Sequence, residues 1–228
     1  MQNKNQKNKK YYITKESDYN YSLTINSNNV DYIEVIYSAI LKLVRGFKDE
    51  KEKSLFFAAE KVESLESCLK STNYHLSEQL CVKLVDDISK QINYYIKNGI
   101  SVYGLDLDDI IVINDNLFII VSTEYILDLN NSKKSMNVFF PLKSPYFGNP
   151  EIYGINNLPS QLSIKSLYYS IGVLVTFCLL NNYLLVGNEI KSNEALKNSL
   201  ESIKGRKLYW FLLRCLEDDV DNRVMLLI

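Results

Sequence analysis

The most regular hydrophobic pattern in the chain is a helical stripe between residues 77 and 98. Its apolar positions, four residues apart, are Leu80, Leu84, Ile88, Ile92 and Ile96. Ser77 can accept a hydrogen bond from the first turn and Asn98-Gly99 can end the last turn, so we predict one long amphipathic helix. Similar spacing predicts further helices over 31–47, 166–180, 193–203 and 207–216, although 40–47 could equally form a strand.

Strand signals occur in the first quarter of the chain and again near its middle. Two β-branched runs at 110–113 and 117–121 are separated by Asn114-Asp115-Asn116, which is typical of a tight hairpin. Shorter runs at 11–14, 21–25 and 54–59 also favour strands. Prolines 141, 145, 150 and 159 predict that residues 141–160 are irregular. The pattern as a whole predicts an α+β protein.

Composition narrows the classes of partner. Lysine plus arginine (26) nearly cancels aspartate plus glutamate (27), so no global field recruits nucleic acid or an anionic membrane. The longest apolar stretch, 167–180, is shorter than the ~20 residues that a membrane-spanning helix needs. We therefore expect neither nucleic acid nor a membrane as a partner.

The cysteines and the first residues point to a cytoplasmic protein. Four cysteines lie far apart in the sequence with a single histidine, so a zinc site or a disulfide framework is not expected. Residues 1–10 contain four lysines and no apolar run that could serve as a signal peptide, which predicts a disordered basic tail. A basic arm that contacts phosphates is the alternative for this tail.

Three motifs, in the order expected of the family, resemble the protein-kinase superfamily over residues 54–223. The segment 144–151 (SPYFGNPE) resembles the end of the activation segment, 165–173 (KSLYYSIGV) the start of the central helix, and 215–223 (CLEDDVDNR) a motif near the C-terminal end. The resemblance implies one kinase-like domain with a reduced β-containing N-lobe (11–62) and a mainly helical C-lobe (63–228). It also implies a buried ion pair between Glu151 and Arg223.

The same resemblance implies that the chemistry has been lost. The first glycine of the chain is Gly46, so the glycine-rich loop over the phosphates is missing. Aligning the strand 110–112 with the family places the catalytic base at Gly104, the metal-binding asparagine at Asp109, and the Asp-Phe-Gly motif at 121–123, beginning with Val121. Because phosphoryl transfer needs a base and bound metal, we expect a pseudokinase without catalytic residues, metal or other cofactor. It would bind a protein partner, such as an active kinase or its substrate, as a scaffold, decoy or regulator.

Two other hypotheses remain open at the level of sequence. In a shifted register Asp106 is the base and Asp109 a metal ligand, while Lys15 and Glu34 resemble the strand lysine and its helix partner. The chain would then be an atypical Ser/Thr kinase or a nucleotide-binding protein that uses ATP and magnesium. Alternatively, the chain is a helical structural or interaction protein unrelated to kinases, in which the hairpin at 110–121 would have no place.

Overall fold

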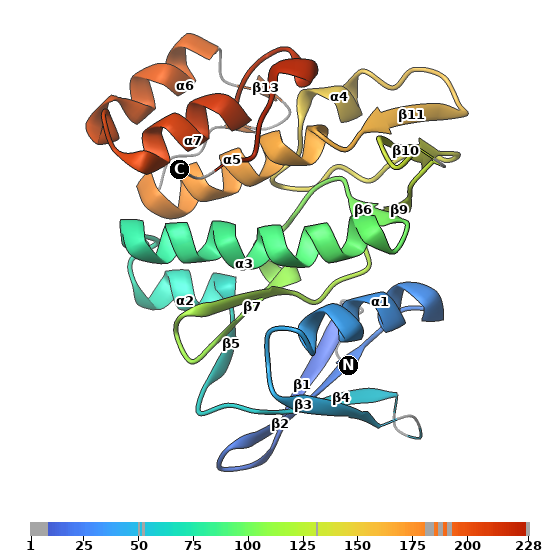
Figure 1. Cartoon of the computed structure of the whole chain (residues 1–228). Helices are drawn as coiled ribbons and strands as arrows, with labels where there is room; N and C mark the ends of the chain where they lie inside the picture. Colours follow the sequence, from blue (N-terminus) through green and yellow to red (C-terminus); the bar gives the residue numbers. More distant parts are fainter. Residues whose placement is uncertain are drawn as a thin grey trace, which may run out of the picture.

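The computed structural model describes residues 9–49, 51, 53–130, 132–180, 185–186, 189–190 and 193–226. The chain is a mixed α+β protein in which an N-terminal sheet with one helix lies below a mainly helical C-terminal part (Figure 1). Within the described residues, no helix is both long and apolar enough to cross a membrane.

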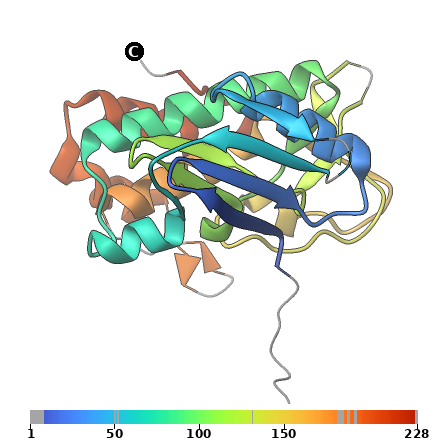
Figure 2. The same cartoon turned by 90° about the horizontal axis from the view of Figure 1, so that it is seen from below.

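The N-terminal sheet is antiparallel and has the strand order β1-β2-β4-β3. Its strands are β1 (Tyr11–Ser17), β2 (Asn20–Ile25), β3 (Gly46–Asp49) and β4 (Ser54–Ala58). Helix α1 (Val30–Ile40) begins after Asn29, whose side chain accepts a hydrogen bond from the Tyr32 N–H. The buried Tyr37 hydroxyl fixes this helix to the sheet, because it accepts from the Ile25 N–H and lies 3.1 Å from the Leu23 carbonyl oxygen. Figure 2 shows the sheet from below.

The C-terminal part is built from helices with short two- and three-stranded sheets at its edges. Its helices are α2 (Leu65–Ser71), α3 (Glu78–Lys97), α4 (Pro150–Tyr153), α5 (Ser166–Leu180), α6 (Asn193–Leu200) and α7 (Lys207–Cys215), with 3-10 turns η1 (Leu107–Asp109), η2 (Glu201–Ile203) and η3 (Val220–Asn222). Its strands are β5 (Val62–Ser64), β6 (Ile100–Val102), β7 (Ile110–Ile113), β8 (Leu117–Ile120), β9 (Ile126–Asp128), β10 (Ser135–Val138), β11 (Ser160–Ser163), β12 (Leu185–Val186) and β13 (Glu189–Ile190).

Helix α5 is the centre of the hydrophobic core. All of its residues except Tyr168 and Leu180 are buried, and it packs against α3 and α7. Gly172 makes the approach to α7 possible, because a Cβ atom there would lie 3.0 Å from Cys215 and Leu216. The all-round apolar character of 167–180 is therefore that of a buried helix.

A short connection, residues 59–61, joins the two parts and is anchored by the β7–β8 hairpin. The Asn114 side chain accepts hydrogen bonds from the backbone N–H groups of Glu60 (2.8 Å) and Lys61 (3.1 Å). Asn114 and Asp115 both have positive φ, the conformation that a tight hairpin turn requires. One turn thus closes the hairpin and holds the connection between the parts.

The long helix, the hairpin and the helix at 166–180 are confirmed. Helix α1 ends at Ile40, so the helical alternative for 40–47 is wrong, and the strand alternative holds from Gly46, where β3 begins after a turn. Phe47 there pairs with Phe56 of β4, and their rings stack at 5.4 Å. The prediction that 141–160 is irregular is wrong at α4 and at Ser160, the first residue of β11. Helix α4 starts on Pro150, at a position where a missing N–H costs no helical hydrogen bond.

Two further expectations are settled by the fold. All four cysteines are buried and free, in agreement with the sequence. A purely helical architecture is wrong for the described chain, because the 110–121 segment forms a β-hairpin. Of the predicted disordered tail, residues 1–8 lie outside the described residues, whereas Lys9 and Lys10 are described and Lys10 directly precedes β1.

Candidate functional site

Three carboxylates gather in the turn between β6 and β7, on the side that faces the N-terminal sheet. Asp106 precedes the 3-10 turn η1, and Asp108 and Asp109 lie within it. The turn is closed locally, because the Asp106 N–H donates to the Asp109 carboxylate at 2.6 Å and the Asp109 N–H to the Asp106 carbonyl at 3.1 Å. This tight geometry brings carboxylate oxygens of all three residues within 4.8 Å of one another.

The ammonium group of Lys10 lies among these carboxylates. Its Nζ atom is 3.2 Å from Asp106, 2.9 Å from Asp108 and 2.8 Å from Asp109, and it also lies 2.8 Å from Glu124, which follows β8. The Lys10 side chain is only 18% exposed. Burial alone would lower the pKa of this lysine, but the charge of Asp109 and the hydrogen bonds to the carboxylates raise it overall, so Lys10 is fully charged.

Asp109 is the most deeply buried member of the cluster, with 1% of its surface exposed. Burial disfavours its charged form and raises its pKa to about 6, although Lys10 and the Asp106 N–H act in the opposite direction. Asp109 therefore takes up a proton as the pH falls from neutrality towards 5.

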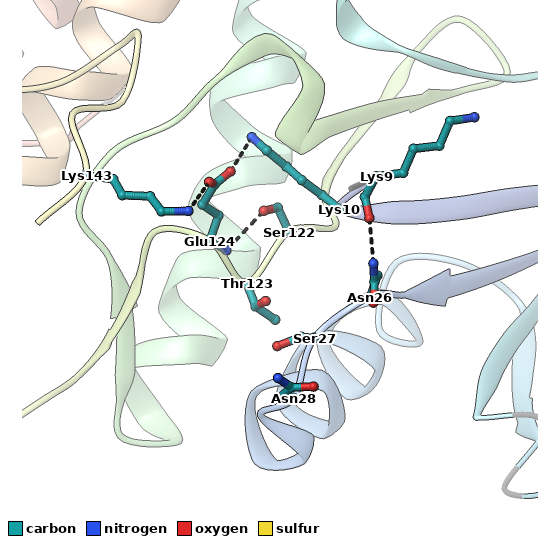
Figure 3. Close-up of a pocket in the computed structure, with 9 residues that line it drawn as sticks. All are labelled: Lys9, Lys10, Asn26, Ser27, Asn28, Ser122, Thr123, Glu124 and Lys143. Carbon is teal, nitrogen blue, oxygen red and sulfur yellow. Dashed lines mark hydrogen bonds and ion pairs between the residues drawn. The ribbon is translucent and has the colours of Figure 1, made fainter. Parts of the chain in front are cut away.

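A polar pocket of about 350 Å³ borders Lys10 on one side (Figure 3). Its lining residues are all polar or charged: Lys9, Lys10, Asn26, Ser27, Asn28, Ser122, Thr123, Glu124 and Lys143. Glu124 bridges Lys10 and Lys143, each at 2.8 Å, and these two cations outweigh its burial and lower its pKa. A second pocket, of about 300 Å³, is also lined by Lys9 and Lys10, together with Tyr11, Tyr12, Ile13, Ser64 and Asp108. Lys9 and Lys10 thus line both pockets.

The segment 145–147 packs against the acidic turn from its other side. A Cβ atom on Gly104 would lie 2.1 Å from the Pro145 ring, so only glycine fits at this position. Both oxygens of Asp106 are used: one accepts from the Tyr146 N–H at 2.6 Å, the other from the Tyr125 hydroxyl at 2.7 Å and from Lys10. Asp106 therefore has no oxygen left without a partner.

Neither the protein-family models nor the curated proteins searched give a match to this chain. Function has to be inferred from the geometry above and from the motifs in the sequence.

The predicted pair of Lys15 and Glu34 does not form. Lys15 is exposed near the end of β1 opposite Tyr21, and among the described residues Glu34 pairs with Lys48 instead. Among the described lysines at the start of the chain, Lys10, directly before the other end of β1, pairs with carboxylates of the C-terminal part. Sequence reasoning assigned it to the tail, although its place directly before the first strand was a usable signal.

The other predicted positions lie around the cluster. Val121 is buried, and its N–H donates to the Asp109 carbonyl at 2.9 Å. Residues 121–123 carry no carboxylate, as the sequence shows, but Glu124, the very next residue, reaches the same lysine as Asp109. The placement of the Asp-Phe-Gly motif at 121–123 therefore stays a prediction, and the carboxylate next to it in sequence, Glu124, lies beside the acidic turn.

The expected ion pair of Glu151 and Arg223 is present, but only Arg223 is fully buried, since the Glu151 side chain is 22% exposed. The two guanidinium Nη atoms donate to the two Glu151 oxygens at 2.9 and 2.7 Å, and Nε donates to the Glu217 carbonyl at 2.7 Å. Arg223 is completely buried and lies over the Tyr169 ring at 4.8 Å. This pair joins the short helix α4 to the end of the chain.

Proposed function

We propose that this chain is a kinase-like protein that does not transfer phosphate and that acts by binding another protein. In this proposal residues 11–62 and 63–228 are the two lobes of one domain. The support is the order of the elements: an antiparallel sheet with one helix, a short connection, and a helical part in which η1 precedes the β7–β8 hairpin. The pairing of Glu151 with Arg223 is what the resemblance implies for these two positions.

The observation that carries the loss of activity is the position of Lys10. Phosphoryl transfer requires metal ions that bridge the phosphates and carboxylates that hold the metal. The three aspartates are spaced closely enough to hold a cation, but the Lys10 ammonium lies within 3.2 Å of each of them. A metal ion would first have to displace this charged side chain, so the acidic turn with Lys10 in place does not fit a metal–nucleotide complex.

A catalytic base is also difficult to find in either register. Gly104 has no side chain, and the Pro145 ring occupies the space that one would need. Asp106, the candidate of the shifted register, binds Lys10, Tyr125 and the Tyr146 N–H with its two oxygens. An acceptor that is already saturated in this way is a poor base for a substrate hydroxyl.

A thermal-shift titration with ATP and magnesium tests the proposal. We expect the melting temperature to rise by less than about 1 °C at 1 mM nucleotide, because a ligand stabilises only a site that it occupies. This concentration is roughly the highest KM of ordinary enzymes. A saturable shift that disappears in Asp109→Asn would contradict the proposal.

That result would favour the second candidate function, an atypical kinase or nucleotide-binding protein that uses Asp106 and Asp109. The observation in its favour is that Glu124 adds a fourth carboxylate to the cluster.

Protein binding is the part of the proposal that concerns the surface. Phe139 and Phe140 are 68% and 57% exposed. They directly precede Pro141, a few residues before the segment 144–151 that resembles the end of the activation segment. Large exposed apolar side chains of this kind are enriched at protein interfaces. An active kinase or a kinase substrate is the partner that the resemblance suggests.

A further inference from the structure

Lys10 is held in its position by more than its charge. The carbonyl oxygens of Lys9 and Lys10 both accept hydrogen bonds from Asn26, from its side-chain amide (3.0 Å) and its backbone N–H (2.9 Å) respectively. The first of these bonds is drawn in Figure 3, which also shows the Lys9 side chain pointing away from Glu124, whereas that of Lys10 points towards it. The fold thus selects one of two adjacent lysines and aims it into the acidic cluster.

The cluster already binds a cation at a defined point. Four carboxylates from two separate segments place oxygens 2.8 to 3.2 Å from one Nζ atom. An ammonium group has three protons, so it cannot form a full hydrogen bond to all four oxygens. Lys10 and Lys143 together also supply fewer positive charges than the four carboxylates supply negative ones. Such a set of oxygens is also what a divalent ion prefers as ligands.

We propose that Lys10 is a tethered cation that takes the place of a divalent ion in this cleft and keeps such ions out. The same side chain ties the N-terminal sheet to the acidic turn of the C-terminal part, next to the two pockets that Lys9 and Lys10 both line. Removing the charge of Lys10 leaves four carboxylates close together without their central cation. Mutual repulsion is then relieved by an ion from solution.

Terbium(III) luminescence tests this directly, because the ion binds carboxylate oxygens and emits when a nearby tyrosine is excited. Tyr125 is the sensitiser, since its hydroxyl lies 2.7 Å from the Asp106 carboxylate. Lys10→Met keeps the aliphatic stem and removes the charge. Lys9→Met is the matched control, because it removes a neighbouring charge outside the cluster. Calcium and magnesium serve as competitors that show whether the site also takes divalent ions.

We expect Lys10→Met to bind terbium at least about tenfold more tightly than the wild type, and calcium to displace it. Lys9→Met is expected to match the wild type. The double variant Lys10→Met/Asp109→Asn is expected to lose the gain. Equal affinity in the wild type and Lys10→Met overturns the proposal, and so does tight binding that survives Asp109→Asn, because the ion is then elsewhere.

If Lys10→Met does not fold, the wild type still decides the matter. Nitrogen-15 NMR of the lysine ammonium groups is expected to show one slowly exchanging signal, absent in Lys10→Arg and unchanged by calcium. A wild-type spectrum without such a signal, or one in which calcium abolishes it, overturns the proposal.

The role of Lys10 at the acidic turn rests on the proposed function only in that loss of the metal site would explain the loss of phosphate transfer. Nucleotide binding tests the proposed function, and ion binding without nucleotide tests the role of Lys10.

Discussion

Breaking the ion pair of Glu151 and Arg223 should destabilise the protein more than any surface substitution. Arg223 is fully buried and donates to both Glu151 oxygens, with two further bonds to the Glu217 and Asp218 carbonyls. In Glu151→Gln the guanidinium stays buried without a counter-charge, and stranding one partner of a buried pair costs about 3–5 kcal/mol. For a chain of this length each kcal/mol lowers the melting temperature by roughly 2–4 °C. We therefore expect a decrease of about 6–20 °C.

Urea unfolding followed by circular dichroism measures the free energies, with Arg223→Met and the double variant completing a thermodynamic cycle. Because both single variants lose the same interaction, the double variant should be destabilised by much less than the sum. The exposed pair of Lys204 and Glu201 provides a matched control, and Glu201→Gln should leave the free energy of unfolding nearly unchanged. Small, additive effects of Glu151→Gln and Arg223→Met would refute the reasoning and weaken the kinase-like assignment.

Three further predictions follow from contacts around the site. Gly104→Ala should lower the free energy of unfolding by about 1–3 kcal/mol, because its Cβ would lie 2.1 Å from the Pro145 ring. Adding Pro145→Gly to this variant should recover the lost stability. The pKa of Asp109 is about 6 in the folded protein and about 3.9 when unfolded, so the folded state binds the proton more tightly. The stabilisation from the protonated Asp109 is present below pH 4 and is lost as the pH rises through 6, by on the order of 1–3 kcal/mol. Asp109→Asn should remove this slope from the pH dependence of the free energy of unfolding. Gln91→Leu should lower the free energy of urea unfolding by about 1–3 kcal/mol, since the Gln91 amide accepts a hydrogen bond from the Ile120 N–H and donates one to the Ile120 carbonyl. An unchanged free energy would show that water replaces the amide.

The elements that the sequence predicted well are those specified by neighbouring residues. Helix α3 has its predicted cap, because the Ser77 side chain accepts from the Leu80 N–H, and Gly99 follows its end with φ +82°. The β7–β8 hairpin likewise depends on Asn114 and Asp115, which adopt positive φ within the turn itself. Such local signals do not require knowledge of the rest of the fold.

The site could not be predicted to the same extent, because its members are distant in sequence. Lys10 lies 99 positions from Asp109, and although its place directly before β1 separates it from the tail, that place does not show that its side chain, rather than that of Lys9, enters the acidic cluster. The choice between these two lysines is made by Asn26, which holds the backbone of both. Glu124 was missed for a related reason: it lies one position beyond the segment that the resemblance compares with the metal-binding motif, and only the tertiary structure shows its contact with Lys10. By contrast, Glu151 and Arg223 were found because two motifs name them directly.

The most direct test of the central claim is a phosphate-transfer assay with radiolabelled ATP and magnesium. It uses the purified wild type beside Asp106→Asn and Asp109→Asn, with the protein itself and generic substrates as acceptors. Because Lys10 binds the carboxylates that would hold the metal and Gly104 offers no base, we predict no incorporation of phosphate by any of the three proteins. Incorporation that survives in both variants would indicate a contaminating kinase. Incorporation by the wild type that disappears in both variants would contradict the account and identify the acidic turn as an active site.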